Sequence, residues 1–112
     1  MSATPGTVVY VNFNPVYGRE QDGEARAALV VSPQFGAMQV VVPLTSNDRP
    51  MPTRAPVTSD PRYGRESYAM CEQVRAVDVG RYVDTAHRVS ADELARVRNV
   101  LAGVLLFGDT DS

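Results

Sequence analysis

The chain has one cysteine, one histidine, no tryptophan and no lysine among its 112 residues. Because Cys71 is the single thiol, no internal disulfide can form, and too few cysteine and histidine ligands exist for a zinc site. No apolar run approaches the roughly 20 residues that span a bilayer, and residues 1–5 lack the basic and apolar parts of a secretory signal. These absences favour a cytoplasmic protein with no membrane contact, no metal and no other cofactor.

Excess positive charge is also missing, since the net charge is −2 and the pI is about 5.3. Non-specific nucleic-acid binding depends on clustered positive charge, which this balance does not supply. All 11 basic residues are arginines, a bias that the base composition of a GC-rich genome would also produce. Each arginine is nevertheless a planar fork suited to bidentate contact with phosphate or carboxylate. A local arginine-lined groove therefore remains compatible with the sequence.

The length of 112 residues fits one domain with a single core, expected over residues 5–107 with a flexible tail at 108–112. β-Branched and aromatic residues, bounded by Gly, Pro and Asn, predict several short strands. The predicted strands are 7–13, 26–32, 38–43 and an edge strand at 53–59, followed by one bent or two short strands over 66–71 and 73–77. The link at 33–37 is expected to be a hairpin connection, residues 60–64 a turn, and 78–84 to contain a helical turn.

The clearest local signal is a helix start at Ser90, where Ser90 and Glu93 fit a capping box. Apolar side chains then recur at helical spacing and predict the face that packs on the sheet. The predicted apolar positions are Leu94, Val97, Leu101, Val104 and Leu105. The expected fold is mainly β, a small and strongly curved antiparallel barrel with one C-terminal helix.

A polar loop, Gly18–Arg26, lies between the first two apolar runs and packs carboxylates, an amide and two guanidiniums into a few residues. A plain hairpin needs only two to five residues, so this loop suits a site carried by a rigid sheet. A solvated surface loop is the alternative. Gly18 and Gly23 are expected to serve backbone geometry only.

Nucleophilic triads need a histidine, and His87 stands alone in a polar stretch, where a structural role is expected. Cys71 lies in an apparent strand, where a buried and unreactive thiol is common. Arginine, carboxylate and hydroxyl groups acting without a metal point instead to phosphoryl transfer or RNA cleavage. In RNA cleavage the ribose 2′-hydroxyl is the nucleophile, and the protein supplies positioning, proton transfer and charge stabilisation.

Three ordered blocks resemble one family. Residues 18–32 resemble the G-x-E-Q-x-G-x-R-P-x-L-V-V-S segment of the MazF/PemK/Kid toxins. Residues 42–46 are similar to the family's V-P-[IVL]-T-[ST], and 71–78 to its [ED]-Q-[VI]-R-[TS]-[IL]-D. Asn12-Phe13-Asn14-Pro15 resembles its D-F-D-P strand end. The resemblance covers roughly residues 6–107.

This resemblance implies an mRNA interferase, an endoribonuclease that cuts single-stranded mRNA at a short sequence without a metal. Attack by the 2′-hydroxyl would leave a 2′,3′-cyclic phosphate and a 5′-hydroxyl. The resemblance also implies an SH3-like barrel of the CcdB/MazF type, a homodimer, and neutralisation by a cognate MazE-like antitoxin.

Carried over by position, Arg26 would stabilise the pentacoordinate phosphate and take part in proton transfer. Thr45 would donate a hydrogen bond to the scissile phosphate, and Glu20 matches a carboxylate implicated in catalysis in some members. The resemblance also gives a set of residues that would bind or position RNA: Arg19, Gln21, Ser46, Glu72, Gln73 and Arg75. Glu72 could also act as acid or base.

The chain departs from the family pattern at three positions and by one inserted residue. Ala27 stands where the family has proline, with one extra residue before Arg26. Arg19 and Met70 stand where the Kid-like branch has a histidine and an arginine. These departures favour Arg26 with Thr45 as the core of the site.

Structural alternatives exist for the same residues. They are an ion pair of Arg26 with Glu20 or Glu72, a turn hydroxyl at Thr45, and an ion pair between Arg75 and Asp78. At the level of function, the alternatives are a CcdB-like toxin that poisons DNA gyrase through protein contact, and a catalytically inactive binding module.

Overall fold

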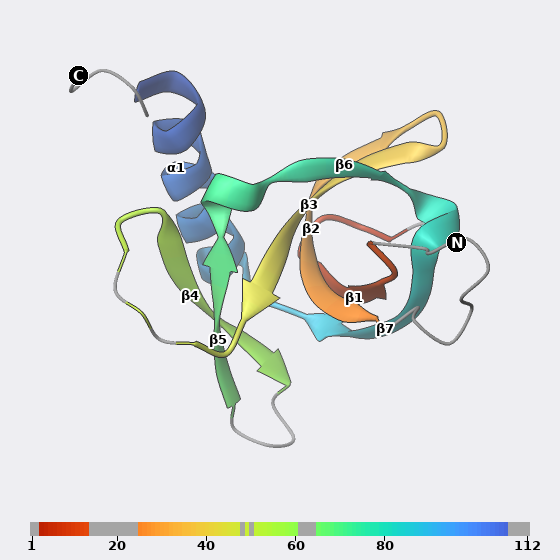
Figure 1. The fold of residues 1–112 in the computed structure, drawn as a ribbon, viewed down its shortest axis with the longest axis horizontal. Helices are drawn as coiled ribbons and strands as arrows, with labels where there is room; N and C mark the ends of the chain where they lie inside the picture. Colours follow the sequence, from red (N-terminus) through yellow and green to blue (C-terminus); the bar gives the residue numbers. More distant parts are fainter. Residues whose placement is uncertain (1–2, 14–24, 48, 50, 61–64, 108–112) are drawn as a thin grey trace.

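The computed structural model describes residues 3–13, 25–47, 49, 51–60 and 65–107. Within these ranges the chain forms seven strands, two short 3-10 turns and one α-helix (Figure 1). The elements are β1 (Thr7–Val11), β2 (Arg26–Phe35), β3 (Met38–Thr45), β4 (Arg54–Asp60), β5 (Arg65–Met70), η3 (Cys71–Gln73), β6 (Arg75–Asp78), η4 (Val79–Arg81), β7 (Tyr82–Arg88) and α1 (Ala91–Phe107).

The strands form one antiparallel sheet in the order β4-β5-β3-β2-β1-β7, with β6 added to β3. β3 pairs with β2 along one side, while its other side pairs first with β6 over Met38–Val41 and then with β5 at Leu44 and Thr45. Because β3 changes neighbours in this way, the β4–β5 hairpin projects from the curved ring of β1, β2, β3, β6 and β7 (Figure 1). The turn η4 links β6 to β7 through the chain, without strand pairing between them in the described residues.

Two apolar clusters fill the two sides of the sheet. Side chains alternate along a strand, so Val8 belongs to one cluster and Val9 to the other. The first cluster joins the sheet to α1 through Val97 and Leu101, and the second fills the inside of the curved ring. Strands that are covered on both faces have consecutive apolar residues. This explains why Val41 and Val42, neighbours in β3, are both apolar and both buried.

A buried amide ties three strands of the ring together. Gln39 is 1% exposed, and its Nε2 donates to the carbonyls of Ser32 at 3.0 Å and Ala3 at 2.6 Å. Its Oε1 accepts a hydrogen bond from the Tyr82 hydroxyl at 2.8 Å. The β2–β3 register shifts between Val30 and Gln34, next to Ser32. The amide thus supplies polar partners where the strand ladder is interrupted.

The predicted capping box begins α1. Glu93 N–H donates to Ser90 Oγ at 3.1 Å, and Ser90 N–H donates to Glu93 Oε1 at 2.9 Å. The other carboxylate oxygen accepts the Thr58 N–H of β4 at 2.9 Å, and Arg98 donates to the Val31 carbonyl of β2 at 2.9 Å. Polar contacts in the first turn and in the middle of α1 therefore hold the helix against the sheet.

The prediction that Leu105 packs on the sheet is wrong, because Leu105 is 64% exposed. Leu101 is buried and Val104 is half-buried, so the packed face runs through Val104. Leu105 is rotated by roughly 100° from Val104, which turns it away from the sheet.

The expected mainly β fold with a C-terminal helix is confirmed, as are the edge strand β4 and the helical turn within 78–84. The sheet is curved but does not close into a complete barrel, since in the described residues β4, β6 and β7 each pair on one side only. Residues 66–77 form two strands separated by η3.

The prediction that residues 33–37 form the hairpin link is wrong. Phe35 pairs with Met38, so only Gly36 and Ala37 connect β2 to β3, and Gly36 adopts a positive φ of 61°. The turn was expected at 60–64, and Asp60 instead ends β4. Residues 61–64 and the tail at 108–112 lie outside the described residues.

No helix in the described ranges has both the length and the apolar character needed to cross a membrane.

Candidate active site

A polar pocket of about 300 Å³ lies where several elements end or begin. The pairing of Ala28 with Pro43 places the start of β2 beside the end of β3. Arg26 and Thr45 therefore lie at the same end of these two neighbouring strands. The end of β5, the turn η3 and the start of β6 complete the rim. The described lining residues are Phe13, Arg26, Pro43, Thr45, Met70, Gln73 and Arg75.

Two guanidiniums belong to this pocket. Arg26 is the first residue of β2, opposite Val11 of β1, and is exposed. Arg75 is the first residue of β6, and its guanidinium carbon lies 5.0 Å from the centroid of the Phe13 ring. Such a cation–π contact orients the arginine. Because the described lining residues include no carboxylate, the pocket carries a positive charge suited to a phosphate.

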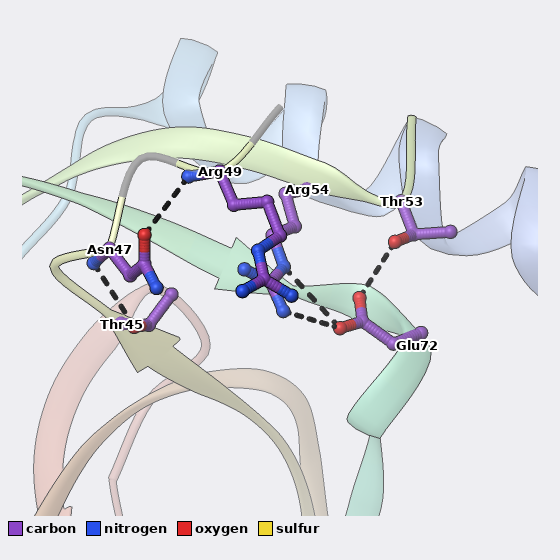
Figure 2. Close-up of polar contacts among 6 residues, drawn as sticks. All are labelled: Thr45, Asn47, Arg49, Thr53, Arg54 and Glu72. Atoms are coloured by element: carbon purple, nitrogen blue, oxygen red, sulfur yellow. Dashed lines mark hydrogen bonds and ion pairs between the residues drawn. The ribbon is translucent and has the colours of Figure 1, made fainter. Parts of the chain in front are cut away.

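The hydroxyl of Thr45 lies at the end of β3 on the same pocket. Its Oγ accepts the N–H of Asn47 at 3.1 Å, and Asn47 Oδ1 in turn accepts the N–H of Arg49 at 3.2 Å (Figure 2). A hydroxyl accepts and donates at once, so its hydrogen remains able to bond a phosphate oxygen. The turn-hydroxyl alternative and the catalytic interpretation are therefore compatible. Ser46 is exposed next to it.

Glu72 is not among the residues that line the pocket. Its Oε1 accepts the Thr53 hydroxyl at 2.7 Å, and its Oε2 accepts Arg54 Nη2 at 3.1 Å and Nε at 3.4 Å (Figure 2). Partial burial alone would raise the pKa of Glu72, but the hydrogen bonds from Thr53, its own backbone and Arg54, with the charge of Arg54, hold it below its ordinary value. Glu72 is therefore ionised at neutral pH.

For two of the alternative ion pairs, Arg26 with Glu72 and Arg75 with Asp78, the structure shows the carboxylate bound to a different group. Within the described residues Glu72 is paired with Arg54 and not with Arg26. The carboxylate of Asp78 accepts the Gly80 N–H at 2.7 Å and caps η4, while Arg75 lies over Phe13.

The predicted site residues divide into three groups. The structure brings four of them together in one region, with Arg26, Thr45, Gln73 and Arg75 on the pocket. It places Ser46 beside the pocket and Glu72 on a separate cluster with Thr53 and Arg54. The others, Arg19, Glu20 and Gln21, lie outside the described residues.

Sequence reasoning missed Phe13 as a lining residue and Thr53 and Arg54 as partners of Glu72. The aromatic side chain of Phe13, just before Asn14-Pro15, was a usable signal, because the predicted strand 7–13 ends there, next to the polar loop. Nothing in the sequence links Arg54 to Glu72, since the pair is formed across 18 residues by the β4–β5 hairpin.

The single thiol and the single imidazole do not contribute to this pocket. Burial, followed by the nearby charge of Glu72, raises the pKa of the Cys71 thiol to about 11, and its Sγ faces the Val97 carbonyl at 3.8 Å. His87 is half-buried on β7 and is not among the described lining residues. Among the side chains that the structure describes, no group of three or more His, Cys, Asp or Glu residues could hold a metal ion.

The curved antiparallel sheet with one C-terminal helix packed against it is the fold of toxins from type II toxin–antitoxin systems. Residues 4–105 match the family described as PemK-like, MazF-like toxin of type II toxin–antitoxin system. The chain belongs to this family.

Solved structures of MazF proteins share the fold. MazF from Deinococcus radiodurans is 27% identical with a TM-score of 0.75, over 94% of this chain and 97% of that one. A MazE–MazF complex from the same organism is 26% identical with a TM-score of 0.76, at the same coverage of 94% and 97%. A mycobacterial endoribonuclease in complex with its cognate antitoxin is 22% identical with a TM-score of 0.74, over 95% and 97%. No curated protein matches the chain significantly.

Proposed function

We propose that this toxin is an mRNA interferase, a metal-independent endoribonuclease that cuts single-stranded mRNA at a short sequence. The observation that carries the proposal is the convergence of Arg26, Arg75 and the Thr45 hydroxyl on one pocket. Two guanidiniums and a hydroxyl supply the charge stabilisation and hydrogen bonding that a phosphodiester needs during cleavage.

In the proposed reaction the ribose 2′-oxygen attacks the adjacent phosphorus and loses its proton. The bond from phosphorus to the 5′-oxygen breaks, and that oxygen gains a proton. The products are a 2′,3′-cyclic phosphate and a 5′-hydroxyl, so no water is consumed in this step.

The residues take the following roles. Arg26 and Arg75 stabilise the negative charge that develops on the non-bridging oxygens, and Arg26 also takes part in proton transfer. Thr45 donates a hydrogen bond to one of those oxygens. Glu20 is assigned to catalysis from the family resemblance. The residues proposed to bind or orient the RNA are Arg19, Gln21, Ser46 and Gln73.

We also propose a homodimer and a MazE-like antitoxin as partners, with the cytoplasm as the compartment. The solved MazE–MazF and endoribonuclease–antitoxin complexes support the antitoxin. An acidic segment that orders on binding would be complementary to the arginine pocket. Leu105 and Leu106, at 64% and 68% exposed, give α1 an apolar end that a partner could bury.

The test is incubation of purified protein with single-stranded RNA in EDTA, beside Arg26→Ala. Arg96→Ala, exposed on α1, is the matched control. Wild type and the Arg96 variant should cut, leaving 2′,3′-cyclic phosphate ends, while Arg26→Ala should lose about 10²-fold or more of the rate, as expected when a transition-state donor is removed. Intact RNA with wild type would refute the proposal, and inhibited DNA supercoiling would then support the CcdB-like alternative.

A further inference from the structure

Side-chain hydrogen bonds hold the connection between β3 and β4 near both of its ends, at Thr45 and at Glu72 (Figure 2). At its start, the Thr45 hydroxyl accepts the Asn47 N–H. At its end, Thr53 and Arg54 bind the carboxylate of Glu72, which belongs to η3. One carboxylate therefore joins the end of this connection to the turn that carries Gln73.

We propose that Glu72 is a positioning residue, which with Thr53 and Arg54 fixes η3 so that Gln73 and Arg75 face the scissile phosphate. This inference rests on the proposed endoribonuclease function. It assigns Glu72 no exchange of protons with the substrate and gives Thr53 and Arg54 a part in the site.

The contacts of Glu72 oppose a role in proton transfer. Both carboxylate oxygens already accept hydrogen bonds from Thr53 and Arg54, and the side chain is only 26% exposed. A group that exchanges a proton with the RNA needs an oxygen within hydrogen-bond reach of the substrate. The pocket lining includes Gln73 but not its neighbour Glu72.

The backbone around Glu72 supports positioning. Cys71 N–H donates to the Thr53 carbonyl at 3.0 Å, and Val74 N–H closes η3 on the Cys71 carbonyl at 3.3 Å. Glu72 adds side-chain hydrogen bonds between η3 and the start of β4, so Thr53 is bound to η3 through both its carbonyl and its hydroxyl. A three-residue turn has few hydrogen bonds of its own, so this outside anchor fixes its orientation.

The ion pair is partly exposed, so it contributes little to folding, and variants should remain folded. Its contribution is placement of the turn. Small displacements of positioning groups reduce reaction rates strongly, by up to about 10²-fold for a shift of about 1 Å. We expect loss of either partner to slow cleavage about tenfold.

The experiment measures single-turnover cleavage of single-stranded RNA with protein in excess, from pH 5 to 9, for Glu72→Gln and Arg54→Met. Glu66→Gln and Arg96→Met are the controls, because both residues are exposed on other elements. Far-UV circular dichroism gives the folded fraction, so that each rate refers to folded protein.

The expected result is an about tenfold slower rate in each single variant, no further loss in the double variant, and an unchanged shape of the pH–rate profile. Wild-type rates in Arg54→Met would overturn the inference. Loss of one limb of the pH profile in Glu72→Gln alone would also overturn it, because Glu72 would then be the acid or base. If wild type leaves the RNA intact, the proposed function itself fails and the inference fails with it.

Discussion

The hydrogen bond between Tyr82 and Gln39 gives the sharpest prediction for stability. Tyr82→Phe removes only the hydroxyl, which donates to Gln39 Oε1 at 2.8 Å in the buried ring of strands. The variant loses one hydrogen bond and leaves a buried amide oxygen without that donor. Together these effects should lower the free energy of unfolding by about 1–3 kcal/mol.

Urea unfolding at pH 7, followed by circular dichroism, measures this change. With an m-value of about 2 kcal/mol/M, the midpoint should fall by about 0.5–1.5 M. Tyr10→Phe is the matched control, because Tyr10 is a half-buried tyrosine of β1, and its change should stay within about 0.5 kcal/mol. Equal midpoints for Tyr82→Phe and wild type would refute the reasoning.

The same variant separates stability from function. Gln39 and Thr45 lie at opposite ends of β3, about 20 Å apart at the rise of an extended strand. Cleavage per folded molecule should therefore be unchanged in Tyr82→Phe. A large loss of rate would show that the buried network reaches the pocket.

Burial alone would raise the pKa of Glu93, but its hydrogen bonds, including that from the Thr58 N–H, hold it below the ordinary 4.5. The stability that the ionised Glu93 adds is thus present above about pH 5 and is lost as the pH falls. In unfolding curves measured from pH 3 to 7, Glu93→Gln should therefore reduce the fall of the unfolding free energy toward acid pH. The thiol of Cys71 should react with Ellman's reagent at pH 8 only after unfolding, because burial raises its pKa to about 11; rapid reaction of the native protein would contradict this. RNA binding should depend weakly on salt, since Arg26 and Arg75 supply few phosphate contacts, and the plot of log K against log salt should have a slope of about −1 to −2. A slope steeper than about −4 would exclude this account.

Local signals in the sequence predicted the fold well. The capping box of Ser90 and Glu93 is read from four consecutive residues, and the structure contains both of its hydrogen bonds. Apolar runs predicted the strands, yet they ended the second strand too early, because Gln34 and Phe35 continue the ladder although Phe35 is exposed. Strand pairing extends as far as two backbones remain in register, and residue type alone does not fix that point.

The candidate site was predictable only in part. The resemblance indicated Arg26, Thr45, Gln73 and Arg75, and the structure places all four on one pocket. The partners of Glu72 could not be anticipated, because tertiary pairing of β4 with β5 brings Arg54 opposite Met70 and so within reach of the carboxylate.

The change of neighbours along β3 has a consequence for the spacing of the two proposed catalytic groups. Thr45 belongs to the two-residue stretch where β3 pairs with β5, whereas Arg26 belongs to β2, which pairs with β1. Side chains of the β4–β5 hairpin pack in the same apolar cluster as Val8 of β1 and Leu29 of β2. The side-chain volumes in that shared cluster therefore influence how far the hydroxyl stands from the guanidinium, although none of the cluster residues lines the described part of the pocket.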